Sequence, residues 1–179
     1  MIEARFASGM KEMLKAMEGA EFAGYSATEF CEKETVHDGK IYLHIDDKTI
    51  KISNEVKEIP WFNHKDLSNS EEIFSFSCAE TSEQGEQKVL VKETIESIEI
   101  ITDYIKIPQN NYEIVLDMAL IIVTGEHRYM ISRGWHFGDY LDINVDKNYD
   151  KIYPVSQVVA EWNNYGEWEV IVERCVEEL

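Results

Sequence analysis

The strongest constraint on the fold comes from two apolar segments, residues 112–123 and 128–133, that flank a short turn sequence. The first segment reads YEIVLDMALIIV and is rich in β-branched and large apolar side chains, while Thr-Gly-Glu at 124–126 supplies the turn. Two such segments around a turn predict a β-hairpin. Because the run 118–123 is almost continuously apolar, we expect a central strand that is covered on both faces.

Alternation of apolar and polar residues recurs along the chain and predicts further antiparallel strands. Residues 41–45 and 50–52 alternate on either side of Asp-Asp-Lys, which predicts a second hairpin. The segment 93–104 fits a strand, but its isoleucines also come close to helical spacing, so both readings stay open. The remaining predicted strands lie at 73–80, 88–94, 139–145 and 167–179.

Two segments have helical periodicity. Between residues 2 and 18, apolar side chains recur at steps of three and four, which predicts an amphipathic helix. Its methionines favour core packing, with an adaptable binding face as the alternative. Pro154 opens a second, short helix near 154–163. The chain is therefore predicted to be a single α+β domain over residues 1–179, with a mainly antiparallel β-sheet of about seven or eight strands.

The charge of the chain limits the partners that it can bind. Its formal net charge is −18, from 35 acidic and 17 basic residues, and the acidic excess is densest in residues 61–103. Such a field repels nucleic acid and anionic membranes and attracts basic partners. We therefore expect no nucleic-acid or membrane partner. A basic protein partner is the functional interpretation, and simple solubility is the alternative.

The expected cellular compartment rests on the lack of membrane-spanning and signal segments and on the pattern of the cysteines. No apolar run approaches the length of a membrane-spanning helix, and the N-terminal segment has no apolar core of a secretory signal. The three cysteines are odd in number and widely spaced, which is typical of free thiols in a reducing compartment. We expect a cytoplasmic protein.

Residues 140–150 resemble the front of a calcium loop, because oxygen-bearing side chains occupy every second position from Asp142 to Asp150. A calcium loop of the EF-hand type needs glycine at position six and an acid at position twelve, where this chain has Lys147 and Tyr153. The alternation instead predicts a half-buried strand that runs into a turn. Since phosphate-loop and dinucleotide motifs are also missing, we expect no metal ion and no cofactor.

Histidines offer the main route to a catalytic site. The stretch 37–47 contains His37, Asp38, His44, Asp46 and Asp47, which can form a zinc or general-base site if the hairpin brings them together. His44 lies between Leu43 and Ile45, so it is predicted to face away from the apolar side and to be exposed. An enzyme would combine His37, His44, His127 or His136 with neighbouring carboxylates.

Two segments are candidates for a partner-binding surface. The stretch 132–140, SRGWHFGDY, places aromatic residues between two glycines, which is typical of a recognition loop; packing of these aromatics onto the core is the alternative. The segment 71–87 offers acids on strand edges and a turn. The predicted partner-binding residues are Glu71, Glu72, Glu80, Glu83, Glu86, Arg133, Trp135, His136, Phe137 and Asp139.

These features favour a small acidic binding protein. Bacterial immunity proteins that occlude basic nuclease toxins have this character, since their carboxylates imitate phosphates and speed association by electrostatic steering. Two alternatives stay open. One is a structural or assembly protein that forms a homo-oligomer through strand edges and the methionine-rich helix, and the other is an enzyme with a histidine–carboxylate site.

Overall fold

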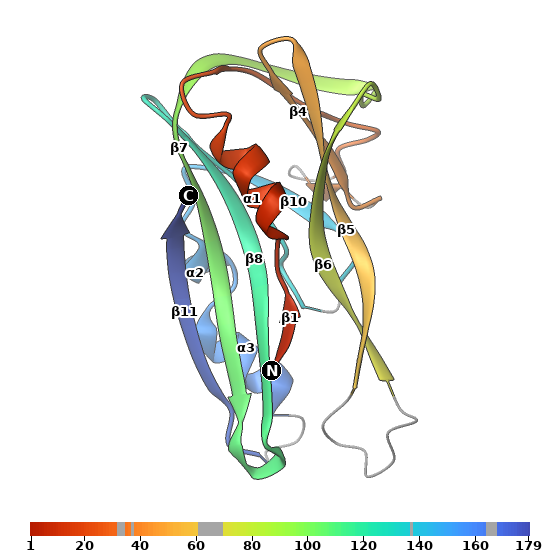
Figure 1. Cartoon of the computed structure of the whole chain (residues 1–179), viewed down its shortest axis with the longest axis vertical. Helices are drawn as coiled ribbons and strands as arrows, with labels where there is room; N and C mark the ends of the chain where they lie inside the picture. The colour runs from red at the N-terminus through yellow and green to blue at the C-terminus, as the bar shows by residue number, and fades with distance from the viewer. Residues whose placement is uncertain (32–34, 37, 61–69, 137, 164–167) are drawn as a thin grey trace.

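The computed structural model describes residues 1–31, 35–36, 38–60, 70–136, 138–163 and 168–179. It confirms the α+β class with a mainly antiparallel sheet, which has 11 strands in the described part of the chain. Three short α-helices accompany the sheet (Figure 1). The strand count exceeds the predicted seven or eight partly because very short strands, such as the two-residue pair at Thr35–Val36, have no periodic pattern to detect.

The elements of the described residues follow one another along the chain in a simple order. They are β1 (Ile2–Ala4), α1 (Ser8–Lys15), β2 (Glu21–Ala27), β3 (Thr35–Val36), β4 (Lys40–Ile45), β5 (Lys48–Pro60), β6 (Ser70–Thr81), β7 (Gln87–Ile107), the 3-10 helix η1 (Pro108–Asn110), β8 (Tyr112–Thr124), β9 (Arg128–Ser132), β10 (Leu141–Val145), α2 (Tyr149–Ile152), α3 (Val155–Trp162) and β11 (Ile171–Glu178). The strand order is β3-β10-β9-β8-β7-β2-β4-β5-β6, with β1 beside β8 and β11 beside β7.

The long strand β7 joins the two halves of the sheet. Residues 87–94 of β7 pair with β2, and residues 95–107 pair with β8. A register shift in β2 between Phe22 and Gly24 interrupts the ladder where the strand bends. Gly24 has a φ of +144°, and a Cβ there would meet the backbone oxygen of Val89 at 2.0 Å, so only glycine fits.

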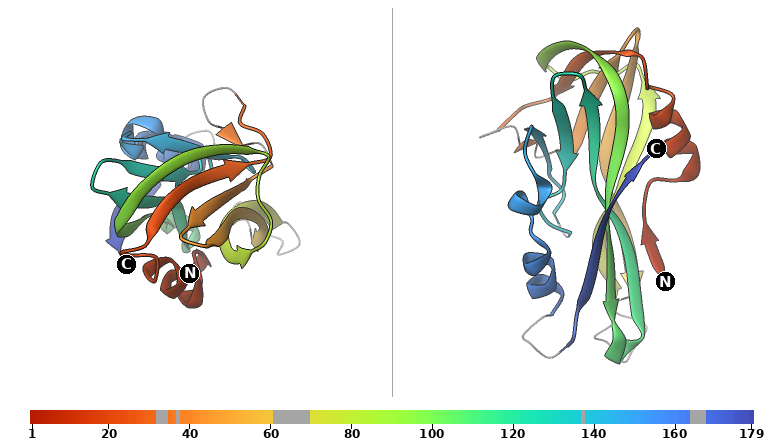
Figure 2. Two further views of the ribbon diagram at one scale, coloured as in Figure 1. Left: turned by 90° about the horizontal axis from the view of Figure 1, so that it is seen from above. Right: turned by 90° about the vertical axis from the view of Figure 1, so that its left-hand side faces the viewer.

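The bent sheet encloses the larger of two cores. Side chains from both halves, such as Leu43 of β4 and Leu120 of β8, belong to one buried cluster, and Leu14 and Met17 pack against it from α1 and the turn after it. Seen from above, the strands curve around this core (Figure 2). The second core joins side chains of β7, β8 and β9 to those of α2 and α3, where Trp162 is fully buried, and it also includes Ile59 of β5 and Ile73 of β6.

The N-terminal prediction was partly wrong. Residues 2–18 were expected to form one helix, but Ile2–Ala4 form β1, parallel to residues 114–116 of β8, and the helix covers only Ser8–Lys15. β9 pairs with residues 119–123 of β8, so the rest of that edge is open to β1. A free strand edge offers hydrogen bonds that outweigh the local helical periodicity.

The structure also tests the expectations for residues 93–104 and for the second helix. Residues 93–104 form part of β7, so the strand interpretation is confirmed. The second predicted helix is confirmed as α3. Among the described residues, no helix has the length and apolarity that a membrane crossing requires.

Candidate functional site

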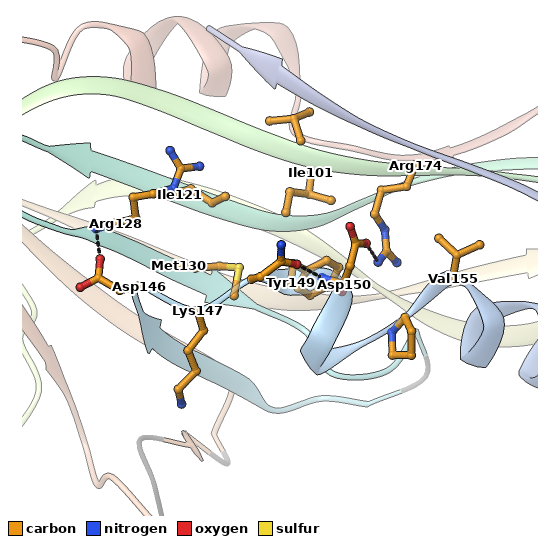
Figure 3. Close-up of a pocket in the computed structure, with 13 residues that line it drawn as sticks. Ile101, Ile121, Arg128, Met130, Asp146, Lys147, Tyr149, Asp150, Val155 and Arg174 are labelled. Atoms are coloured by element: carbon orange, nitrogen blue, oxygen red, sulfur yellow. Dashed lines mark hydrogen bonds and ion pairs between the residues drawn. The ribbon is translucent and has the colours of Figure 1, made fainter.

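A cleft of about 760 Å³ lies between the sheet and α2 (Figure 3). Its floor is apolar and is formed by Ile101, Ile121 and Met130, one from each of three neighbouring strands. Charged groups stand at its rim. The full lining is Ile101, Ile121, Arg128, Met130, Asp146, Lys147, Asn148, Tyr149, Asp150, Pro154, Val155, Arg174 and Val176.

Two of the three cations that line the cleft are paired with carboxylates, while the third, Lys147, donates to the side-chain oxygen of Asn144 at 2.8 Å. Arg128 contacts both carboxylate oxygens of Glu99, at 3.0 and 2.5 Å. Arg174 contacts Asp103 and also Asp150, the latter at 2.9 Å, and its guanidinium lies 4.6 Å from the centre of the Tyr149 ring. The lining acids Asp146 and Asp150, together with Glu99 and Asp103, offset the charge of these cations, so the cleft has no evident preference for an anion.

A buried polar network lies behind the cleft. The Nδ1 of His136 is 2.8 Å from the hydroxyl of Tyr153 and accepts a hydrogen bond from Trp162, while Nε2 lies 3.7 Å from Asp103. Tyr153 also donates to Glu161. Burial alone would raise the pKa of Asp103, but hydrogen bonds and charges from Arg174 and His136 outweigh it and hold that pKa below its ordinary value.

The centre of this network is sealed from solvent, although Glu161 at its margin is partly exposed. The side chains of His136 and Asp103 are 0% exposed. Among the described residues, no histidine lines this cleft or the smaller cavity beside α1. A substrate therefore cannot reach the imidazole without an opening of the fold. The hydrogen bonds of Tyr153 and Trp162 with His136 orient the packing of α2 and α3, and the contact of His136 with Asp103 positions them against β7.

The predicted recognition loop is divided between the interior and the surface. Arg133 and His136 are buried, whereas Trp135 is 42% exposed and Asp139 is exposed; Phe137 lies outside the described residues. Arg133 donates to the carbonyls of Phe74 and Asp117 and lies 4.8 Å from the Phe76 ring centre. Burial lowers the pKa of its guanidinium to about 10, so it stays charged at neutral pH. Arg133 thus ties the loop to β6.

The predicted acidic residues do not form one surface. Glu80 lies near the end of β6, and Glu83 and Glu86 lie in the turn that follows, whereas Glu72 lies near the start of that 12-residue strand, opposite Glu58. The side chain of Glu71 lies outside the described residues. Glu80 is 3.1 Å from Lys48, and Glu83 is 3.7 Å from Lys51. Such exposed pairs contribute little and exchange easily.

A smaller cavity of about 210 Å³ lies beside Glu80 and the β4–β5 turn. Met13 and Met17, from α1 and the turn after it, line it together with Ile45 and Ile50 of the β4–β5 hairpin. Asp46, Asp47, Lys48 and Glu80 also belong to its lining. The cavity therefore combines flexible apolar side chains with carboxylates, a combination that suits the aliphatic stem and charged end of lysine or arginine.

The prediction for His44 was wrong, because its side chain is buried. Its Nε2 lies 2.9 Å from the hydroxyl of Ser26, and its Nδ1 lies 3.2 Å from that of Thr49. Burial, with a smaller contribution from Lys88, lowers the pKa of His44. The serine is fully buried and accepts a hydrogen bond from the amide of Gly85, so it is not accessible as a nucleophile. His37 and His64 lie outside the described residues.

The turn at residues 140–150 is held by its own side chains. Asp142 accepts a hydrogen bond from Thr35 at 2.6 Å, and Asn148 caps α2 by accepting from the amide of Asp150. Asp146 has a φ of +56° and contacts His127 at 2.7 Å. The acids of this stretch therefore point to different neighbours, as expected for a strand that runs into a turn.

Sequence reasoning missed Asp103, Asp117 and Arg174. The available signal was a single acid inside an otherwise apolar strand, since such an acid must be paired when it is buried. Asp103 pairs with Arg174, and Asp117 accepts from Arg5 at 3.1 Å and from Thr102 at 2.7 Å. The arginine partners could not be predicted because Arg5 and Arg174 lie far from these acids in the sequence.

Comparisons of the chain with protein-family models, curated proteins and solved structures found no match. The site geometry is therefore the basis for the function proposed below.

Proposed function

We propose that this protein is a non-catalytic binding protein that captures a basic protein partner and occludes its cationic surface. The observation that carries the proposal is the placement of the acids. Among the described residues, Asp103 and Asp117 are the buried acids, while the net charge of the chain is −18. The carboxylate excess therefore lies on the surface, where it attracts basic partners.

The acidic end of the molecule is the best candidate for the contact. We define it as Asp46 and Asp47 on the β4–β5 turn, Glu80 near the end of β6, and Glu83 and Glu86 on the β6–β7 turn. A lysine or arginine of the partner can place its aliphatic stem on the methionines of the small cavity and its charge near Asp47 and Glu80. The partner's cation would compete with Lys48 for Glu80. The side chains of Lys48 and Glu80 are both more than half exposed, so their ion pair is easily exchanged.

A second acidic pair lies at the opposite end of the β5–β6 hairpin. Glu58 and Glu72 occupy directly opposite positions in the register, and both are exposed. Like charges at opposite positions destabilise a sheet. A cationic partner would relieve this repulsion, so the pair is consistent with a binding role along the hairpin.

The histidine-based enzyme is less well supported than binding. His136 and His44 are buried, and His127 contacts Asp146 at the edge of the sheet. Neither described cavity is lined by two of these histidines. The catalytic alternative therefore lacks a pocket in which histidines and carboxylates could act together on a substrate. Assembly into a homo-oligomer remains the second binding mode to test.

The proposal can be tested by affinity capture from a lysate of the source organism, with elution in a salt gradient and identification of the bound proteins. We expect a basic protein that is released at high salt. A matched bait in which Glu80, Glu83 and Glu86 are changed to glutamine should retain less of it. Recovery of the protein alone, as a symmetric oligomer, would contradict the proposal and favour assembly.

A further inference from the structure

The turn between β8 and β9 carries a cluster of ligand atoms that is separate from the acidic end. One carboxylate oxygen from each of Glu93 and Glu126 and one ring nitrogen of His127 lie within 4.8 Å of one another. The three residues come from β7 and from the turn at residues 125–127, which the register places next to each other through the Ile95–Thr124 pair. Mixed nitrogen and oxygen donors at this separation can converge on one cation after small side-chain rotations.

The histidine is oriented for a metal by a group outside the cluster. Its Nδ1 lies 2.7 Å from an oxygen of Asp146, whose other oxygen accepts from the amide of Arg128 at 2.9 Å. Because Nδ1 is engaged, Nε2 is the ring nitrogen that is left for a ligand. A carboxylate that holds the far nitrogen of a ligating histidine is the usual second layer of protein metal sites.

Glu93 is oriented in the same way. Tyr129 donates to one of its carboxylate oxygens at 2.9 Å, and Thr124 donates to the other at 2.5 Å. Thr124 also fixes the turn, since its hydroxyl oxygen accepts a hydrogen bond from the amide of His127 at 3.0 Å. Two of the three candidate ligands are therefore held in place by neighbours that are not ligands themselves.

The charge around the turn favours a cation. Glu96 lies over the turn, with a carboxylate oxygen 3.1 Å from the position that a Cβ of Gly125 would take. Arg128 is the nearest base in the sequence, and its guanidinium is occupied by Glu99. A histidine with two carboxylates suits a borderline transition metal better than magnesium or calcium, which prefer all-oxygen ligands.

We propose that Glu93, Glu126 and His127 bind a divalent transition-metal ion of the zinc type, with Asp146 as a positioning residue. Three protein ligands leave at least one coordination position open to water or to an outside ligand. The ion would link β7, the β8–β9 turn and β10 at one edge of the sheet. This inference does not depend on the basic partner proposed above.

The test is a calorimetric titration of the full chain with zinc chloride, with magnesium chloride as the comparison. We expect one zinc ion per chain and no comparable binding of magnesium. His127→Gln and Glu93→Gln should each weaken zinc binding at least about tenfold, and Asp146→Asn by about tenfold. Glu113→Gln, at the far end of β8, is the matched control and should bind zinc as the wild type does.

Circular dichroism and melting temperatures establish that each variant is folded before its affinity is compared. Several weak sites per chain, or a zinc affinity that His127→Gln leaves unchanged, would overturn the proposal. Either result would mean that surface carboxylates bind the ion nonspecifically. Loss of binding in Glu113→Gln as well would also contradict a site at this turn.

Discussion

Arg174 and Asp103 face each other across β11 and β7 and form a two-bond ion pair, with Nε–Oδ1 at 2.6 Å and Nη2–Oδ2 at 2.7 Å. The arginine side chain is 7% exposed and the aspartate is 0% exposed. The pair therefore fixes the last strand to the centre of the sheet and separates the cleft from the His136 network.

Removal of one partner of this pair should be costly. Arg174→Met leaves the Asp103 carboxylate buried without its cation, so we expect a loss of about 3–5 kcal/mol in the free energy of unfolding. The double variant Arg174→Met with Asp103→Leu should recover much of that loss, because it leaves no isolated charge. Urea denaturation measures the free energy of unfolding of the single and the double variant. A single variant within about 1 kcal/mol of the wild type would show that the pair is not buried as described.

The same pair predicts a dependence of stability on pH. The folded-state pKa of Asp103 is held below its ordinary value of 3.8, so the unfolded chain takes up the proton first as the pH falls. The stability that Asp103 contributes should be complete above the unfolded pKa and should disappear as the pH falls through the folded one. Denaturation at pH 7 and at steps below pH 4 therefore should give a difference between wild type and Asp103→Asn that shrinks with acidity. A constant difference would contradict the assignment.

Arg133 and Trp135 lie two residues apart, but we expect them to contribute very differently to the stability of the fold. Arg133→Ala removes two charge-assisted hydrogen bonds to backbone carbonyls and opens a cavity, so it should cost about 3 kcal/mol or more. Trp135→Ala removes a side chain that is 42% exposed and should cost less than about 1.5 kcal/mol. Thermal unfolding of the two variants side by side tests this order, and equal losses would contradict it.

The cysteines report on the contact between α1 and β6. Burial raises the pKa of Cys78 to about 11, and its Sγ lies 3.8 Å from the carbonyl of Met10. Cys175 is exposed. At pH 8, iodoacetamide should therefore alkylate Cys175 in the native protein and reach Cys78 only after unfolding. Mass spectrometry of digests distinguishes the sites. Equal rates for the two would show that α1 does not cover this part of β6.

The sequence predicted the fold wherever the pattern was local. The hairpin of β8 and β9 and the helix after Pro154 were found because their periodicity extends over several residues. β1 was missed because its place beside β8 depends on where β9 ends, which no local pattern contains. His44 was expected to be exposed, but it is buried because β4 is covered on both faces, so alternation no longer distinguishes inside from outside.

The candidate site was less predictable than the fold. Arg133 and His136 were singled out for a recognition loop, yet both are buried, because their partners in β6, β7 and α3 come from other parts of the chain. Glu72 and Glu80 were grouped by their closeness in the sequence. An extended strand separates them by about 3.3 Å per residue, so they lie far apart on the surface. Composition alone predicted the acidic surface on which the proposed function rests.

The most direct test of that function is the rate of association between this protein and the basic partner recovered by affinity capture. The rate should be measured over a range of salt concentrations for the wild type and for Glu80→Lys, Glu83→Lys and Glu86→Lys combined, with Glu113→Lys as the control. We predict a fast wild-type rate that falls steeply with salt, a slower and flatter rate for the triple variant, and a nearly unchanged control. Equal rates for the wild type and the triple variant at low salt would contradict electrostatic capture by the acidic end.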